Sequence, residues 1–79
     1  MGEHNPIVIH SRVTGKLYCE DNVVHIFDVL KAYRYMCNGA ELIDLFPSHG
    51  GDGSERLCFI FNKADDELLE PLWLARKLR

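Results

Sequence analysis

Long apolar runs and an excess of basic charge are both absent from this chain. No apolar segment approaches the roughly 18–20 residues that cross a membrane, and the first residues lack the charged, then apolar, pattern of a signal peptide. The formal net charge of −3 differs from that of general nucleic-acid binders, which gather Lys and Arg against phosphates. We therefore expect a soluble, cytoplasmic protein whose partner is neither a membrane nor a nucleic acid.

Paired cysteines are absent as well. Cys19, Cys37 and Cys58 are odd in number, and none lies two residues from another. A disulfide scaffold has an even number of cysteines, and a structural zinc site has C-x-x-C pairs. Each of the three lies in an apolar stretch, where a free thiol packs as a small hydrophobic side chain. We expect free cysteines in or just beneath the core of a protein from a reducing compartment, with no metal or other cofactor.

The chain is nevertheless rich enough in apolar residues to fold. Its 79 residues are 47% hydrophobic and 27% charged, which is the globular range and the size of one small domain. The domain is expected to span residues 1–79, with residues 1–5 disordered.

The first half of the chain predicts a hairpin followed by a helix. β-Branched residues over 7–13, a turn at Thr14-Gly15-Lys16 and the segment Leu17-Tyr18-Cys19 indicate two short strands. The carboxylates and amide of Glu20-Asp21-Asn22 can cap a helix over about 23–37, which Asn38-Gly39 would end.

This predicted helix has an apolar stripe at three- and four-residue steps, which we expect to face the core. The stripe consists of Val23, Ile26, Phe27, Leu30, Tyr33 and Cys37, widened by Val29 and Met36.

The second half predicts two strands and a helix. A strand over 41–46 would end at Pro47, and an apolar segment over 56–61 is typical of a central strand. A final helix would be capped by Asn62 or Asp65 and broken near Glu70, with Pro71 opening a second piece that extends to Leu78. We expect Leu68, Leu69, Leu72 and Trp73 to remain on one side of it. The basic residues Arg76, Lys77 and Arg79 suit the negative end of this helix or a recognition tail.

The predicted fold is thus a small single-domain α+β fold, an antiparallel sheet packed by two helices in the order β-β-α-β-β-α. From the first helix onward the pattern resembles a family of small uncharacterised β-α-β-β-α domains of phage and bacterial origin. The resemblance is carried by the helix over 26–39, the strand Leu42-Ile43-Asp44-Leu45, the Gly-rich turn, the strand Phe59-Ile60-Phe61 and the acidic segment Asp65-Asp66-Glu67. It implies a small accessory protein and transfers no catalytic residue.

Few residues have the spacing of a catalytic or metal site. His25 and Asp28 lie three residues apart, but the second His of H-E-x-x-H is missing. A nucleophilic Cys19 beside the same His25, or an enzyme based on Cys37, is a weaker alternative. We expect a protein without enzymatic activity.

Two surfaces are candidates for binding. The Gly-rich loop over 48–54 can contact a partner through His49 and Asp52, or can hold a small ligand or nucleotide with its backbone N–H groups. The second surface lies opposite the apolar stripe of the first helix, where Tyr35 gains little unless a partner covers it. This side groups Val24, Asp28, Lys31 and Tyr35.

The favoured function is a small acidic protein that binds another protein, with a phage-encoded modulator of a host protein as its most specific form. A homodimer is also expected, because small domains leave much surface unburied and because Leu74 and Leu78 face away from the side of the kinked final helix that covers the sheet.

Overall fold

The computed structural model describes residues 7–51 and 53–79, so the expected disorder of residues 1–5 and the loop residue Asp52 lie outside the described residues. The chain forms the expected small α+β fold with antiparallel strands and two helices. One additional strand stands before the first helix, so that from Val23 onward the order is β-α-β-β-α.

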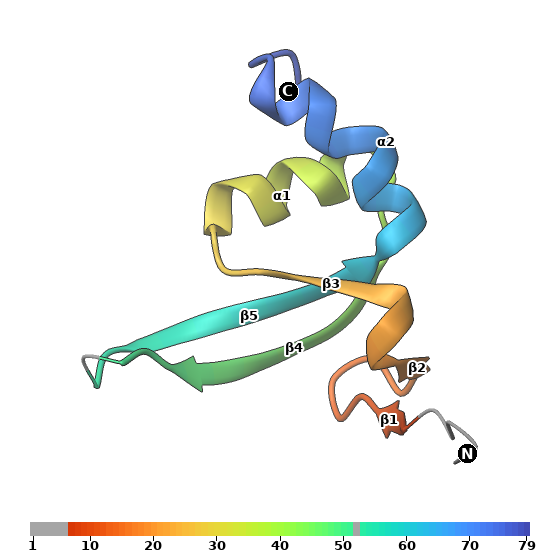
Figure 1. Cartoon of the computed structure of the whole chain (residues 1–79), viewed down its shortest axis with the longest axis vertical. Helices are drawn as coiled ribbons and strands as arrows, with labels where there is room; N and C mark the ends of the chain where they lie inside the picture. Colours follow the sequence, from red (N-terminus) through yellow and green to blue (C-terminus); the bar gives the residue numbers. More distant parts are fainter. Residues whose placement is uncertain (1–6, 52) are drawn as a thin grey trace, which may run out of the picture.

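A three-stranded sheet lies at the centre of the molecule (Figure 1). It consists of β3 (Val23–Ile26), β4 (Leu42–His49) and β5 (Glu55–Asn62), in the order β3-β5-β4. The prediction of a central strand over 56–61 is confirmed, because β5 pairs with a neighbour on both sides.

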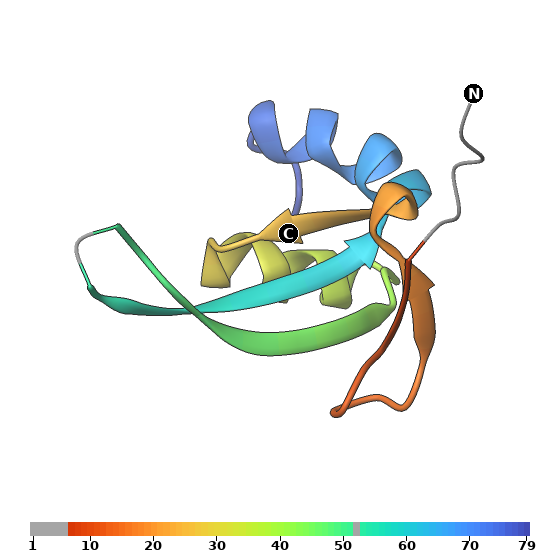
Figure 2. The ribbon, with the colours of Figure 1, turned by 60° about the horizontal axis from the view of Figure 1, so that its bottom comes forward.

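The two faces of this sheet are covered by different parts of the chain. The helices α1 (Val29–Cys37) and α2 (Lys63–Leu74) lie on one side, and the N-terminal hairpin of β1 (Val8–His10) and β2 (Leu17–Cys19) lies on the other (Figures 1 and 2). The pairing of β1 with β2 confirms the predicted hairpin. The β4–β5 hairpin projects beyond the helices in both views.

Each face has its own apolar core. Between the sheet and the helices lie Ile26, Ala32, Tyr35, Ala40, Phe59, Phe61 and Leu78, flanked by Val24, Leu42, Leu45, Leu69 and Trp73. Between the sheet and the N-terminal hairpin lie Tyr18, Val23, Ile43, Cys58 and Ile60, flanked by Ile9 and Phe46. Alternate residues of β5 enter opposite cores, as the period of two along a strand requires.

The predicted start of the first helix was wrong. Residues 23–26 pair with β5 as strand β3, while residues 20–22 form a short 3-10 turn. The helix begins at Val29, and its N-cap is Asp28, whose carboxylate accepts a hydrogen bond from the Lys31 N–H at 3.1 Å. The predicted end at Asn38-Gly39 is confirmed, and Gly39 adopts a φ of 91°, which favours glycine.

Two predictions based on proline were also wrong. Pro47 does not end β4, which continues to His49 with Pro47 opposite Leu57. Because β4 is an edge strand, the missing N–H of Pro47 is tolerated there. The final helix is likewise unbroken at Pro71 and ends at Leu74 rather than Leu78.

Exposure explains why α2 tolerates its proline. Pro71 and Glu67, whose carbonyl loses its intrahelical donor, are both exposed, so water can satisfy that carbonyl. Leu69 and Trp73 pack on the core as expected, but Leu68 and Leu72 are exposed. The last turn of α2 contains no basic residue, so Arg76, Lys77 and Arg79 follow the helix instead of completing it.

Candidate functional site

Helix α1 buries the face opposite to the one that its apolar pattern predicts to be buried. The residues that it buries are Ala32 and Tyr35, both with 0% exposure. The Tyr35 ring packs edge to face on Phe61 with 5.4 Å between ring centroids, and its hydroxyl donates to Asp66 of α2 at 2.6 Å. Burial, together with this hydrogen bond to a carboxylate, raises the pKa of Tyr35 well above its ordinary value. The expectation that Tyr35 is exposed was therefore wrong.

The opposite side of α1 carries the apolar residues that were expected in the core. We call this surface the α1 stripe: Val29, Leu30, Tyr33, Met36 and Cys37. Val29 and Tyr33 are 60% and 59% exposed. Spacings of three and four residues align these side chains along one face of the helix.

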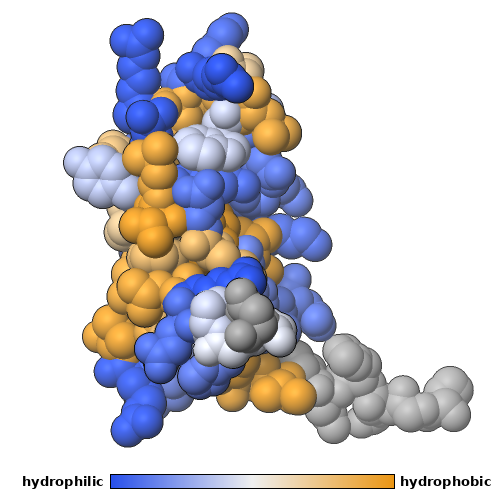
Figure 3. Space-filling model, turned by 90° about the vertical axis from the view of Figure 1, so that its left-hand side faces the viewer, coloured by the Kyte–Doolittle hydropathy of each residue, from blue (hydrophilic) through white to orange (hydrophobic). Residues whose placement is uncertain are grey.

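The α1 stripe is large for so small a protein. Val29, Leu30, Tyr33 and Met36 are between 38% and 60% exposed and Cys37 is exposed beside them, so the stripe is a contiguous apolar surface of the kind that marks interaction sites. Figure 3 shows hydrophobic side chains gathered at the level of α1 and continuing down toward the sheet. Phe27, expected in the core, is also exposed and lies beneath the guanidinium of Arg56.

The predicted binding group of Val24, Asp28, Lys31 and Tyr35 does not form one helix face. Val24 belongs to β3 and packs toward the helix-side core, and Asp28 caps α1. Lys31 is half-buried, with its ammonium 5.7 Å from the centre of the Tyr35 ring. The structure therefore does not bring these four residues together on one exposed surface.

Of the other predicted contact residues, His49 and Leu74 belong to different elements, β4 and α2, and Asp52 lies outside the described residues. His49 is the exposed last residue of β4, so the loop predicted over 48–54 is a shorter turn between antiparallel strands. In that turn the Gly50 N–H donates to the Ser54 carbonyl at 2.8 Å. Leu74 is 71% exposed at the end of α2, as expected.

Leu74 lines a hollow of about 370 Å³ beside α1, which we call the C-terminal notch. The notch is lined by Arg34, Trp73, Leu74 and Arg76. On α1, Arg34 is four residues after Leu30 and three before Cys37, so the notch adjoins the α1 stripe.

The chain after α2 is held against α1 at this end. Arg34 donates to the Leu78 carbonyl at 3.1 Å, and the Asn38 amide donates to the Arg79 carbonyl at 2.7 Å. Leu78 is buried in the core between sheet and helices, so the expectation that it faces away from the core was wrong. Two segments far apart in the sequence therefore form one surface.

A buried carboxylate joins the N-terminal hairpin to β4. Asp44 is 6% exposed and accepts hydrogen bonds from the hydroxyls of Ser11 and Tyr18 at 2.6 and 2.7 Å, and from the Leu45 N–H. A register shift between Leu42 and Asp44 accompanies the burial of both Ile43 and Asp44. Burial opposes the charge of Asp44, but the hydrogen bonds outweigh burial and hold the pKa of this carboxyl below its ordinary value. An ionised carboxylate so fully paired acts as a structural anchor.

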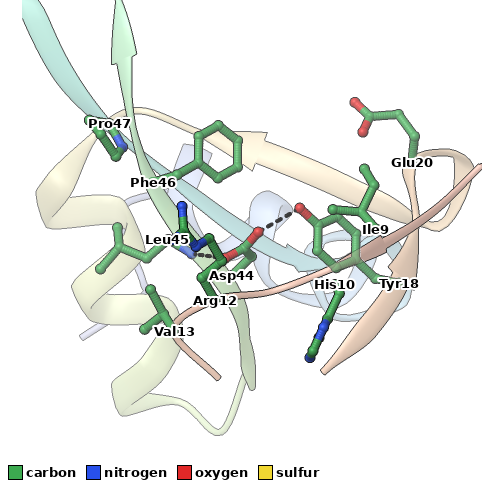
Figure 4. A pocket seen from close by; sticks show the side chains of 10 residues that line it. All are labelled: Ile9, His10, Arg12, Val13, Tyr18, Glu20, Asp44, Leu45, Phe46 and Pro47. Atoms are coloured by element: carbon green, nitrogen blue, oxygen red, sulfur yellow. Dashed lines mark hydrogen bonds between the residues drawn. The ribbon is translucent and has the colours of Figure 1, made fainter. Parts of the chain in front are cut away.

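A hollow of about 580 Å³ lies between this hairpin and β4 (Figure 4). Asp44 and Tyr18 lie within it, and most of the remaining lining is apolar: Ile9, Val13, Leu45, Phe46 and Pro47, with the polar residues His10, Arg12 and Glu20. Burial and the bond to Asp44 raise the pKa of Tyr18, so its hydroxyl stays protonated and remains a hydrogen-bond donor.

The cysteines and His25 take no part in a common site. All three cysteines are free, but only Cys58 is buried, and Cys37 is exposed, which corrects the expectation that each is packed. His25 is on β3 with its Nε2 3.0 Å from Glu20, so it shares no helix face with Asp28. Within residues 7–51 and 53–79, no three His, Cys, Asp or Glu side chains are grouped to hold a metal ion.

Comparison with known proteins found no matching family model, curated protein or solved structure. Among the described residues, no helix has the length and apolar character to span a membrane.

Sequence reasoning missed the orientation of α1. One signal was available: Val23, Val24 and Ile26 are β-branched and favour a strand, which leaves Asp28 as the natural cap of a shorter helix.

Proposed function

We propose that this chain is a non-enzymatic module that binds another protein through the α1 stripe. The single observation that carries the proposal is the exposure of the stripe along the whole length of a helix whose opposite face is packed. Apolar side chains at helical spacing gain free energy when a partner covers them, at about 25 cal/mol per Å² before the cost of association.

The nearby side chains suit binding better than chemistry. The stripe offers an aromatic ring, a thioether and aliphatic groups, which are typical of the centre of protein interfaces. Met36 is flexible enough to adapt to a partner surface, and Tyr33 supplies a large contact area with few rotatable bonds.

The test compares one stripe variant with a matched control. Tyr33→Glu places a charge in the stripe, and Leu68→Glu places the same charge on α2, at a leucine that is 73% exposed and lies outside the stripe. A protein captured from the source cell by the wild type should be retained by Leu68→Glu and lost by Tyr33→Glu, and the purified pair should show at least a ten-fold difference in Kd. The proposal would be contradicted if both variants retained the captured protein equally, or if the wild type captured no more protein than the Tyr33→Glu variant.

A photo-crosslinking side chain at position 33 locates the contact independently. It should form a covalent adduct with the same captured protein, whereas the same group at position 68 should not.

A further inference from the structure

Positive charge is concentrated at one end of an otherwise acidic protein. Residues 29–40 and 71–79 contain five of the nine Lys and Arg residues and none of the 12 Asp and Glu residues. These segments meet through the bonds from Arg34 to Leu78 and from Asn38 to Arg79. Four of these cations, Arg34, Arg76, Lys77 and Arg79, lie where the two segments meet, and within the described part of the chain none of the four forms an ion pair with a carboxylate.

Two of these cations, Arg34 and Arg76, line the C-terminal notch next to the α1 stripe. Arg34 stands between the α1 stripe and the C-terminal notch, and Arg76 lines the far side of the notch. Trp73 and Leu74 supply its apolar lining. The notch therefore fits one large apolar side chain with acceptor groups for guanidinium on either side.

From this arrangement we propose that the α1 stripe and the C-terminal notch together bind an acidic amphipathic helix of another protein. This inference rests on the proposed function and names the chemistry of its partner. The grooves beside Leu30, Tyr33 and Cys37 accept the ridges of a second helix, as in other helix–helix contacts. An apolar residue of the partner enters the notch, and neighbouring Glu or Asp residues pair with Arg34 and Arg76, which favour planar carboxylates.

Charge complementarity selects this occupant over a second copy of the chain. A symmetric contact uses the same surface of both copies, and residues 29–40 and 71–79 of a second copy contain no Asp or Glu that could pair with Arg34 and Arg76. A nucleic acid would pair with the cations but would leave the stripe uncovered.

The probe is a library of helical 15-residue peptides without Trp. Apolar residues are fixed at positions i, i+3, i+4 and i+7, and Glu, Gln or Lys is allowed at the flanking positions. The wild-type chain should enrich peptides with flanking Glu, and the Tyr33→Glu variant should not. Trp73 is the single Trp of the chain and lines the notch, so its fluorescence reports binding of each selected peptide.

A charge reversal tests the role of the cations. Arg76→Glu combined with Lys77→Glu should weaken the Kd of an acidic peptide at least ten-fold and should favour the Lys version of that peptide. Arg12→Glu combined with Lys63→Glu changes the net charge equally elsewhere and should leave the Kd within two-fold. Circular dichroism confirms that both variants are folded.

The outcomes separate the two proposals. If the wild-type chain retains peptides in a way that depends on Tyr33 but shows no preference for flanking Glu, the proposal of an acidic partner is overturned and the proposed function stands. Equal retention of all peptides by wild type and Tyr33→Glu, with no Tyr33-dependent cellular partner, overturns both. Vesicles containing phosphatidylserine that bind more tightly than any peptide would assign the surface to a lipid. A doubling of the 9.1 kDa mass in sedimentation equilibrium, reversed by Tyr33→Glu, would assign it to a second copy.

Discussion

The hydroxyl of Tyr35 donates a 2.6 Å hydrogen bond to Asp66 and thereby joins α1 to α2. Because the same ring packs on Phe61 of the sheet, one side chain connects three elements. This contact fixes which face of α1 is buried, and it leaves the more apolar face exposed.

Removing only the hydroxyl should weaken this junction. Tyr35→Phe keeps the ring contact but leaves Asp66 without its donor, so we expect the free energy of unfolding to fall by about 1–3 kcal/mol. Asp66→Asn should cost a similar amount. In a double-mutant cycle measured by urea denaturation, the pair should cost less than the sum of the single variants. Strict additivity would show that the bond contributes nothing to stability.

The exposed stripe should be nearly irrelevant to folding of the isolated chain. Replacing Leu30 or Tyr33 by Ser is expected to change the free energy of unfolding by no more than about 0.5 kcal/mol, as at other exposed positions. Ala32→Leu, on the buried face, should cost about 1–3 kcal/mol because the added atoms have no room. If Leu30→Ser cost several kcal/mol, the orientation of α1 described above would be wrong.

Acid should loosen the N-terminal hairpin. Because the folded-state pKa of Asp44 lies below its unfolded value of about 3.9, the contribution of this carboxylate is complete above that pH. It is lost as the pH falls through the lower folded-state pKa. Unfolding curves at pH 7, 4 and 3 should therefore show a fall in wild-type stability that Asp44→Asn, already less stable at pH 7, largely lacks.

An exposed carboxylate provides the control for this pH dependence. Glu67→Gln should reproduce the wild-type profile, because Glu67 is exposed on α2. A fall that persists in Asp44→Asn and disappears in Glu67→Gln would assign the acid sensitivity to α2 instead.

The three thiols should react at different rates. Cys37 is exposed, Cys19 is half-buried and Cys58 is buried, where burial and nearby carboxylates raise the pKa of the Cys58 thiol. Alkylation followed by mass spectrometry should modify Cys37 first and Cys58 only after unfolding. Modification of Cys37 with a bulky maleimide should also block the captured partner, since this residue lies in the α1 stripe. Binding that survives complete modification would place the partner elsewhere.

Local patterns in the sequence determined several elements of this fold. The turn around Gly15, the helix end at Gly39 and the apolar segment from Leu57 to Phe61 each follow from short-range backbone or packing preferences, and each is found in the structure.

The two prolines led to wrong predictions because the effect of a proline on a strand or helix depends on its surroundings. Pro47 is tolerated at a sheet edge and Pro71 on an exposed helix face, and neither environment is encoded next to the residue.

Only the tertiary structure decided which face of α1 is buried. Periodicity identified two sides of the helix, and the more apolar side was assigned to the core because burial of apolar area is favourable. The choice depended instead on partners supplied by distant segments: Phe61 and Asp66 contact Tyr35, and the core between sheet and helices encloses the small side chain of Ala32. The candidate binding surface follows from that choice, since it is the side of the helix that the fold leaves uncovered.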